Sequence, residues 1–574
     1  MIRAELGRER VDGFLDTRGT KIVNGAGEEV LLAGWGLGNW LLCEGYMWLS
    51  GGAERFDRPR RIERVICELC GAEYARNFWR TFRDRYITED DIRLMAELGY
   101  NSVRIPINAR LFLSEGPGLN WDETGFALLD RCIDWCEKHR LYAFIDLHGA
   151  PGGQTGANID DSLDDVPRLF LDQDCFDKGV ALWKKLAQRY KDRWIVGGYD
   201  LLNEPLRPER VGYGGGVGGG EADAAAPDRN RDTAYLLPRL VEFYEAAIRE
   251  IRAVDERHLI TLEGHHWATG TEVFCKKYDP KTVIHFHRYA CLPDVEAFAP
   301  YLALRERWES PLWLGETGEN DIEWFTAMYP LAAELGIGFN VWPWKKMRCV
   351  NSPCSVAPPE GWERLIEYAR GGAHPGYEAA RGALDAYLDA ILLQNCAVNE
   401  EVTQAVFRRP GCTIRGTDFD ELPGPGVSYL SRSDEEHLYH YRRATRMRII
   451  EKTQDKPRSF SFDCGWKRFV LGLAEGEFAV YTLCDVTMLS RAEIHCYSAA
   501  SATLNVSQDG EPLGSFTLGG VGDIQVIGSL KLRAAARTQL RLEVTSGAVE
   551  IDSIHTSGGE SIVGNQYSPR ANHE

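Results

Sequence analysis

The chain has 574 residues, 44% of them hydrophobic and 26% charged, which is enough for two or three globular domains. Its formal net charge of −19 argues against nucleic acid and anionic membranes as partners, because the average surface would repel both. The N-terminal stretch lacks the apolar segment of a signal peptide, and no apolar run reaches the ~18 residues of a membrane span. Fifteen cysteines without a disulfide framework then predict reduced thiols in a cytoplasmic protein.

Between residues 29 and 344, short apolar runs alternate with amphipathic helical patterns. Eight runs end in polar or aromatic residues: 29–40, 100–108, 141–149, 195–204, 258–267, 282–289, 311–317 and 336–344. The main predicted helices are 87–99, 123–139, 178–193, 235–254 and 322–335. Thr88 and Asp91 are spaced as a capping box for the first of these helices. The alternation predicts parallel βα units and, with eight of them, an α/β fold of the closed (β/α)8 TIM-barrel type; a doubly wound open sheet is the alternative.

Two insertions interrupt this pattern. Residues 43–86 lengthen the loop after the first strand, and the Gly- and Ala-rich residues 211–227 are predicted to form a mobile loop. Both follow strand ends, on the barrel face that carries active sites. The acidic residues 158–167 follow the third strand, so we expect them and the first insertion to wall one side of a pocket there.

The pattern changes after the barrel. Residues 377–409 are helical and carry an apolar stripe, which predicts a connector that is buried between two domains. The stripe comprises Leu384, Leu388, Ile391 and Leu392. After residue 411, short alternating strands with Gly and Asp turns predict an all-β jelly-roll sandwich, with a hairpin at Asp509–Gly510. The predicted domains are the barrel at 1–375, the helical connector at 376–410 and the β-sandwich at 411–574.

Polar and aromatic residues end the predicted barrel strands, and in a barrel they converge on one pocket. They are Arg104, His148, Asn203, Glu204, His287, Tyr289, Glu316 and Trp342. Pro205 forbids continuation of the fourth strand, so Glu204 is predicted to be its last residue and to emerge from rigid backbone. Two carboxylates in an aromatic pocket suit glycoside hydrolysis, in which one protonates the leaving oxygen and the other stays ionised.

The neighbours of the two glutamates are given supporting roles. Arg104 is predicted to hold Glu316 ionised through charge-assisted hydrogen bonds. Asn203 offers an amide to a sugar hydroxyl, and Trp342 offers a platform for a sugar ring. The pair His266 and Trp267, in "GHHW", is predicted to contact sugar hydroxyls.

We expect no metal and no cofactor. His285 lies near His287 in the sequence, but a packed or supporting role is the favoured interpretation. A structural zinc site needs four ligands. Two cysteine pairs could supply them only if the first insertion folded over the last barrel loop: Cys67 with Cys70, and Cys349 with Cys354.

The motifs "NSVRIPI", "FIDLHGAPGGQ", "YDLLNEP", "FHRY" and "WLGETG" resemble glycoside hydrolase family 5, from about residue 30 to 350. The resemblance implies a retaining mechanism with Glu204 as acid/base and Glu316 as nucleophile. It places six more residues at supporting positions: Arg104, His148, Asn203, His287, Tyr289 and Trp342. The closest motifs are those of exo-acting β-1,3-glucanases and β-glucosidases, although the long insertions and "TGANIDDSLDDVPRLF" depart from that branch.

The resemblance therefore implies a β-linked glucoside or short β-glucan oligosaccharide as substrate, which is hydrolysed near its chain end. Retention implies carboxyl groups about 5–5.5 Å apart. A β-mannosidase, an endo-β-glucanase, a transglycosylase and a catalytically silent sugar-binding barrel remain alternatives. The last part of the chain resembles carbohydrate-binding modules of families 6 and 35, with Gly476-Glu477-Phe478 where such modules often carry Gly-Glu-Trp. Sugar binding and structural bracing of the barrel are both open for this part.

Overall fold

The computed structural model describes residues 10–207, 233–433, 441–452, 462–520 and 522–559. Eight parallel strands close into a barrel: β3 (Ala33–Gly36), β4 (Ser102–Asn108), β5 (Tyr142–Gly149), β6 (Val196–Asp200), β7 (Leu259–Glu263), β8 (Thr282–Arg288), β9 (Leu312–Gly318) and β10 (Gly338–Trp342). β10 pairs with β3, with Phe339 opposite Ala33, and this pairing closes the ring. The predicted (β/α)8 barrel is confirmed, and the open sheet is wrong. The loop predicted at 211–227 lies outside the described residues.

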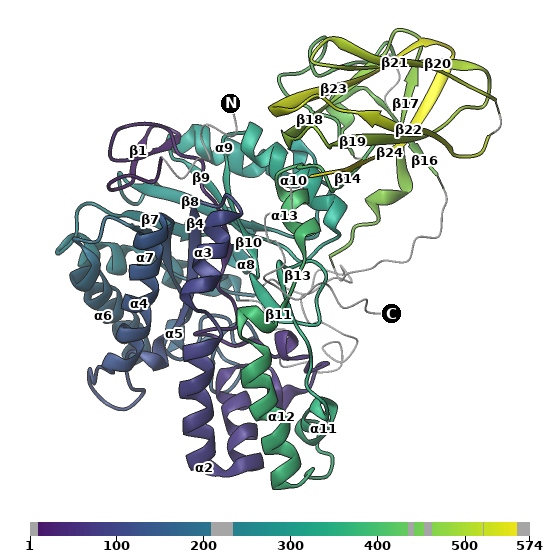
Figure 1. The fold of residues 1–574 in the computed structure, drawn as a ribbon. Coiled ribbons are helices and arrows are strands. Elements are labelled where there is room, and N and C mark those ends of the chain that lie inside the picture. Colours follow the sequence, from purple (N-terminus) through teal and green to yellow (C-terminus); the bar gives the residue numbers. More distant parts are fainter. Residues whose placement is uncertain (1–9, 208–232, 434–440, 453–461, 521, 560–574) are drawn as a thin grey trace.

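Helices cover the outside of the barrel (Figure 1): α3 (Glu89–Glu97), α4 (Glu123–His139), α6 (Gln173–Tyr190), α7 (Leu237–Arg252), α9 (Ala299–Trp308) and α10 (Ile322–Glu334). The predicted capping box starts α3, where the Thr88 N–H donates to Asp91 Oδ2 at 2.9 Å. The long strands β4, β5 and β9 are buried at every residue, because alternate side chains face the barrel interior and the helices. Their carboxyl ends share one end of the barrel and position the site.

The first insertion forms short 3-10 turns at Gly45–Trp48 and Glu54–Phe56 and the helical segment α2 (Pro59–Arg85), which is broken at Gly71, where φ is +82°. Trp48 is the centre of an aromatic cluster formed with α2, α11 (Trp362–Ala369) and α12 (Tyr377–Ala390). Its ring partners are Phe78, Trp79, Phe82, Trp362 and Tyr387.

The apolar stripe of α12 is buried against this insertion, since α12 packs along α2 (Figure 1). The prediction that the stripe lies between two domains is therefore wrong. The stripe required an apolar surface, and the sequence pattern did not reveal that the insertion supplies one. Short pairings complete this part of the molecule: β1 (Asp16–Arg18) with β2 (Lys21–Val23), and β11 (Lys345–Met347) with β12 (Cys354–Val356) and β13 (Ala397–Val398).

Two antiparallel sheets form the last part of the chain. One contains β16 (Arg448–Glu451), β17 (Phe469–Ala474), β24 (Ala548–Ser557), β19 (Arg491–Tyr497) and β22 (Gln525–Lys531), with β14 (Thr413–Arg415) beside β24. The other contains β15 (Tyr429–Leu430), β18 (Phe478–Val486), β23 (Ala535–Ser546), β20 (Ala502–Gln508) and β21 (Glu511–Leu518). Asp509 and Gly510 both have positive φ and form the predicted hairpin turn between β20 and β21.

Arginine-centred contacts join the sandwich to the barrel. Arg408, which follows α13 (Glu400–Val406), donates through Nε to the Thr326 carbonyl of α10 at 2.5 Å. The same guanidinium donates to Asp420 Oδ1 and to the Asp418 carbonyl, both at 2.6 Å. The sandwich therefore packs on the barrel near α10 and α13, as Figure 1 shows. The domain limits at 375 and 410 stay predictions.

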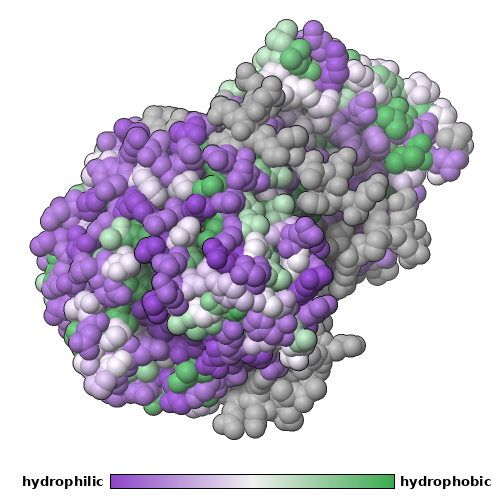
Figure 2. Space-filling model, turned by 60° about the horizontal axis from the view of Figure 1, so that its bottom comes forward, coloured by the Kyte–Doolittle hydropathy of each residue, from purple (hydrophilic) through white to green (hydrophobic). Residues whose placement is uncertain are grey.

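The visible surface is mostly polar. Figure 2 shows a largely hydrophilic face on which hydrophobic residues form small, separate patches. The helical segment α2 carries many arginine and glutamate residues. Among the described residues, no helix has both the length and the apolar composition needed to cross a membrane.

Candidate active site

Arg104 lies on β4 at the centre of the candidate site and is completely buried. Its Nη1 donates to Glu316 Oε2 at 2.6 Å, and its Nε donates to Asp200 Oδ2 at 2.8 Å. Its Nη2 donates to Asn203 Oδ1 and to Glu263 Oε1, both at 2.8 Å. The expected contact with Glu316 is present. One guanidinium also fixes groups from β6, from the loop after it and from β7.

Glu316 lies on β9, and hydrogen bonds hold both of its carboxylate oxygens. Arg104 donates to Oε2, and the Tyr289 hydroxyl donates to Oε1 at 2.6 Å. Burial raises the pKa of Glu316 above its ordinary value, and it outweighs the opposing effect of His287 and Arg104. The carboxylate is thus oriented by two donors in a site of low polarity.

Glu204 lies four residues beyond β6, so the prediction that it ends the strand is wrong. The Leu201 N–H still donates to the Thr261 carbonyl of β7 at 3.2 Å, and the chain then leaves the sheet. Glu204 has a φ of +43°, in the left-handed region, and Pro205 after it disfavours the right-handed helical conformation. A tight turn, rather than a strand end, therefore presents this carboxylate.

His287 connects the two predicted catalytic glutamates. Its Nδ1 lies 2.7 Å from Glu204 Oε1 and 3.9 Å from Glu316 Oε1. The Glu204 backbone N–H donates to Glu263 Oε2 at 2.6 Å. A ring nitrogen of His287 and one carboxylate oxygen from each glutamate all lie within 4.8 Å of one another. The fold thus brings both carboxylates to one small volume.

His148 and Trp342 form a stacked pair, with ring centroids 5.3 Å apart and planes at 5°. His148 Nδ1 lies 2.8 Å from Asp146 Oδ2, and its Nε2 lies 3.1 Å from the Asn203 amide nitrogen. Burial lowers the pKa of His148 to about 3, so this ring is neutral near pH 7. These three predicted supporting residues therefore belong to one connected group.

A layer of buried acidic and imidazole groups lies beneath the site; a packed or supporting role was predicted for its histidine, whereas its three carboxylates were not predicted. It comprises Asp146, Asp200, Glu263 and His285. His285 Nδ1 lies 3.0 Å from Asp200 Oδ1, and its Nε2 lies 3.1 Å from a ring nitrogen of His287. The signal that could have found Asp146 is the two-residue spacing of "DLH", because alternate strand residues point to the same side.

The first insertion supplies a wall of the site. The Tyr46 hydroxyl accepts from Trp342 Nε1 at 2.9 Å and donates to Glu319 Oε2 at 3.2 Å. Lys346 Nζ lies 2.6 Å from Glu319 Oε1. Burial raises the pKa of Glu44, with further increases from nearby carboxylates that include Glu316 and Glu204. These wall residues were not predicted from the sequence.

The acidic loop at 158–167 binds the same insertion. The Arg60 N–H donates to Asp161 Oδ1 at 2.9 Å, and its Nε donates to the Asp161 carbonyl at 2.8 Å. Asp165 pairs with Arg58 at 2.7 Å and with Arg61 at 3.0 Å. The two segments expected to form a wall are therefore joined to each other.

His266 and Trp267 lie on the short helix α8 (His265–Ala268), which follows β7, and both have positive φ. The Trp267 N–H donates to the Leu206 carbonyl at 3.3 Å, two residues after Glu204. His266 Nε2 and Trp267 Nε1 are buried without a hydrogen-bond partner among the described residues. The structure thus brings this turn beside the Glu204 loop, but no described contact joins its side chains to either predicted catalytic glutamate.

Three side-chain groups are close enough to hold a metal ion: Glu263, His285 and His287; Glu204, His287 and Glu316; and Asp146, Asp200 and Glu263. Arg104 donates to a carboxylate of each group, so the guanidinium already supplies positive charge there. None of these groups, found among the described residues, contains a cysteine. The alternative of a four-cysteine zinc site is therefore not supported.

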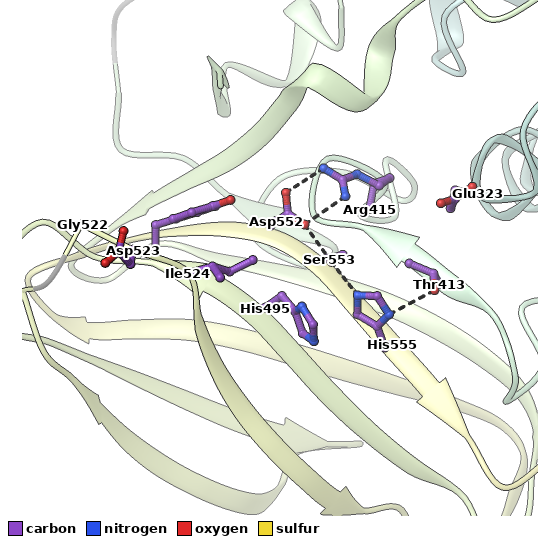
Figure 3. Close-up of a pocket in the computed structure, with 11 residues that line it drawn as sticks. Glu323, Thr413, Arg415, His495, Gly522, Asp523, Ile524, Asp552, Ser553 and His555 are labelled. Carbon is purple, nitrogen blue, oxygen red and sulfur yellow. Dashed lines mark hydrogen bonds and ion pairs between the residues drawn. The ribbon is translucent and has the colours of Figure 1, made fainter. Parts of the chain in front are cut away.

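A separate cavity of about 650 Å³ lies where the sandwich meets α10. Figure 3 shows a chain of hydrogen-bonded side chains that line this cavity: Arg415, Asp552, Ser553, His555 and Thr413. Their polar groups are largely engaged within this chain of contacts. Sugar binding by the sandwich stays one of two open alternatives, the other being structural bracing of the barrel.

The family model of cellulase (glycosyl hydrolase family 5) matches residues 68–347. A β-xylosidase of Phanerodontia chrysosporium is 30% identical over 292 residues, which cover 50% of this chain and 55% of that protein. Endoglucanase C of Acetivibrio thermocellus is 24% identical over 46% of this chain and 85% of its own length. A sporulation-specific glucan 1,3-β-glucosidase of Saccharomyces cerevisiae is 34% identical over 30% of this chain and 40% of its own.

The alignment spans only about half of the β-xylosidase, so the comparison concerns the barrel and not whole proteins. The residues that match the family model, 68–347, include Arg104, Glu204 and Glu316. The family assignment agrees with the motifs that suggested it. Over residues 68–347, just under half of the chain, the barrel matches glycosyl hydrolase family 5.

Proposed function

We propose that this protein is a retaining β-glycosidase, which cleaves β-linked sugars through a covalent glycosyl-enzyme. The observation that carries the proposal is that an oxygen of Glu204 and an oxygen of Glu316 lie within 4.8 Å. Retaining enzymes hold their carboxyl groups about 5–5.5 Å apart, whereas inverting enzymes leave about 6.5–9.5 Å for a water. The short distance supports direct attack by a carboxylate.

The surroundings of the two groups support different roles. Arg104 and Tyr289 donate to the two oxygens of Glu316, which favours its ionised form as the nucleophile at the anomeric carbon. Glu204 contacts His287 instead and is proposed to protonate the leaving oxygen. After the aglycone departs, Glu204 removes a proton from the water that attacks the glycosyl ester of Glu316, and retention follows from two displacements.

We further propose action near the chain end of a β-linked glucoside or short β-glucan. The first insertion and the acidic loop are joined through Arg60 and Asp161, and Tyr46 contacts Trp342 at the site. A wall in this position would accept a terminal sugar and obstruct a polymer that runs through. The names of the relatives include glucosidase, xylosidase and endoglucanase, so the sugar and the mode of cleavage need direct measurement.

The test is a panel of aryl β-glucosides, β-mannosides and β-xylosides with short β-glucans and mannans, followed by NMR of the first-formed anomer. A β-anomer from a β-glycoside supports retention, and an α-anomer contradicts it. A fast fall in viscosity of a long β-glucan would instead indicate endo action. Products longer than the substrate would indicate transglycosylation.

The role of Glu204 is tested with Glu204→Ala. This variant should retain more activity on aryl glycosides with good leaving groups than on poor ones, because good leaving groups need little protonation. Azide should accelerate it and give a β-glycosyl azide, since azide attacks the glycosyl-enzyme without a general base. Equal losses on all leaving groups, with no azide product, would assign the proton transfer elsewhere. A wild-type protein that binds sugars but cleaves none would favour the silent sugar-binding alternative.

A further inference from the structure

One loop of the sandwich lies on the catalytic face of the barrel. Residues 462–467, here called the docking loop, precede β17. Phe462 and Trp466 of this loop are buried. The loop contacts the segments that directly follow β8 and β9, the two strands whose ends carry Tyr289 and Glu316.

Asn320 ties three segments together at this point and is completely buried. Its Nδ2 donates to the Phe462 carbonyl at 3.1 Å and to the Tyr289 carbonyl at 3.3 Å. Its own carbonyl accepts from Asn351 Nδ2 at 3.2 Å. A single amide thus joins the sandwich loop to the backbone of the residue that donates to the proposed nucleophile.

Two further contacts fix the docking loop from its other end. Lys467 Nζ lies 2.9 Å from Asp321 Oδ1 and 3.2 Å from Glu323 Oε2 at the start of α10. Cys464 Sγ lies 3.4 Å from the Cys291 carbonyl, two residues after Tyr289. The loop is therefore held at three positions, Phe462, Cys464 and Lys467.

The ring of Phe462 packs on the ring of Tyr289, with centroids 4.8 Å apart and planes at 31°. Tyr289 in turn donates its hydroxyl to Glu316 Oε1 at 2.6 Å. Tyr289 follows the last residue of β8, so the strand ladder does not fix its conformation. The aromatic contact limits the movement of the Tyr289 ring and keeps its hydroxyl on the carboxylate.

We propose that Phe462 is a positioning residue of the active site, supplied by the sandwich, that holds Tyr289 in hydrogen-bonding contact with Glu316. This inference rests on the proposed function, in which Glu316 is the nucleophile. It gives the sandwich a direct part in catalysis that does not require the sandwich to bind sugar. The effect of Phe462 passes through Tyr289 and not through contact with the substrate.

The experiment is a double-mutant cycle in the full-length protein. Tyr289→Phe should lower kcat/KM for an aryl β-glycoside about 10- to 100-fold, the size expected for one hydrogen bond to a charged group. Phe462→Ala should lower it about tenfold, because misplacement of a catalytic group is costly. The combined variant should lose little more than Tyr289→Phe alone, since both changes remove the same interaction. Independent effects would multiply, and that result would overturn the proposal.

The pH profile gives a second readout that a purely structural role would not change. Loss of the Tyr289 hydrogen bond disfavours ionised Glu316, so the acid limb of kcat/KM should move to higher pH in both single variants. Phe462→Leu keeps much of the apolar contact and should restore most of the activity. If Phe462→Ala is too unstable to purify, Phe462→Val, which cannot stack on the Tyr289 ring, enters the same cycle.

Phe516→Ala is the matched control, because Phe516 is a half-buried phenylalanine of β21 in the other sheet of the sandwich. It should leave kcat/KM and the acid limb unchanged. A Phe462→Ala protein with wild-type kcat/KM and an unmoved acid limb contradicts the inference alone. Failure of the proposed function is recognised separately, as a wild-type protein that is inactive on the glycoside panel or is unaffected by Glu316→Gln.

Discussion

Two buried clusters in this molecule are built around arginines, and they differ in what the arginines contact. In the active site, Arg104 donates to three carboxylates and to the side-chain oxygen of Asn203. At the contact between barrel and sandwich, Arg408 donates to one carboxylate and to two backbone carbonyls. Arg442 of the sandwich donates to the Phe419 carbonyl at 2.6 Å and to the Pro293 carbonyl at 3.4 Å.

The difference lies in the balance of charge. Around Arg104 the acidic groups outnumber the arginine. Burial raises the pKa of Asp146 and the pKa of Glu263. The pKa of Asp200 is lowered instead, because the effects of His285 and Arg104 exceed that of burial. At the domain contact, neutral carbonyls satisfy most of the arginine donors. The first arrangement produces carboxyl groups with unequal proton affinities, which acid–base chemistry needs. The second arrangement joins two domains through arginine donors whose partners are mostly groups that do not ionise.

The sharpest test of this contrast is Glu316→Gln, which should lower kcat at least about thousandfold, because an amide cannot form the glycosyl ester. The amide oxygen can still accept from Arg104, so the midpoint of thermal unfolding should change little. Steady-state kinetics on an aryl β-glycoside and thermal denaturation measure both effects. Glu306→Gln, at an exposed position of α9, is the control and should retain wild-type activity. Substantial residual turnover would remove Glu316 from the nucleophile role.

Arg104→Met should reduce both activity and stability. The substitution leaves several buried carboxylates without their cation, and removal of one partner of a buried ion pair costs about 3–5 kcal/mol. Chemical denaturation at pH 8 and pH 5 measures the loss. The loss should be smaller at pH 5, because protonation of carboxyl groups with raised pKa relieves their repulsion. Equal stability of variant and wild type at pH 8 would show that Arg104 does not compensate this cluster.

Arg408→Met should reduce stability without changing the chemistry. Asp420 would lose its cation but keep the hydrogen bond from Thr482 Oγ1 at 2.7 Å, so we expect a loss of about 3 kcal/mol. The kcat of the folded variant should stay within about twofold of wild type. A substitution this far from the proposed active site should change the activation free energy by less than ~0.5 kcal/mol. Denaturant titration and kinetics on the same preparation separate the two effects. A large fall in kcat would mean that Arg408 also orders the active site.

These clusters also show what the sequence could and could not predict. The barrel was predictable because eight apolar runs and their intervening helices have different periodicities. The residues at the strand ends were predictable because parallel strands present their carboxyl ends on one side. Arg408 and Arg442 carry no such signal, because backbone carbonyls are their main partners and every residue offers one. Phe462 was missed for a related reason: its contact with Tyr289 spans 173 residues and depends on how two domains dock.

The smallest predicted effect concerns Asp418, which lies beside the contact of Arg408. Burial raises the pKa of its carboxyl to about 6, and its Oδ2 has no hydrogen-bond partner among the described residues. In an unfolded chain the same group has a pKa of about 3.9. The folded protein therefore binds this proton more tightly, so the contribution to stability is complete below pH 4 and is lost as the pH rises through 6. The total change is at most about 3 kcal/mol, from a difference of about two pKa units.

Asp418→Asn removes the ionisation but keeps an oxygen that can accept from the Tyr441 hydroxyl, which lies 3.1 Å from Asp418 Oδ1. The variant should be more stable than wild type at pH 8 by about 1–2 kcal/mol, and less than the full difference because the amide N–H groups also need partners. Its stability should also be flatter between pH 4 and pH 6. Free energies of unfolding from urea titrations at pH 4, 6 and 8 give both quantities. A variant that is less stable than wild type at pH 8 would mean that the ionised Asp418 carboxylate is a favourable partner of the interface arginines. The balance of charge assigned to the domain contact would then be wrong.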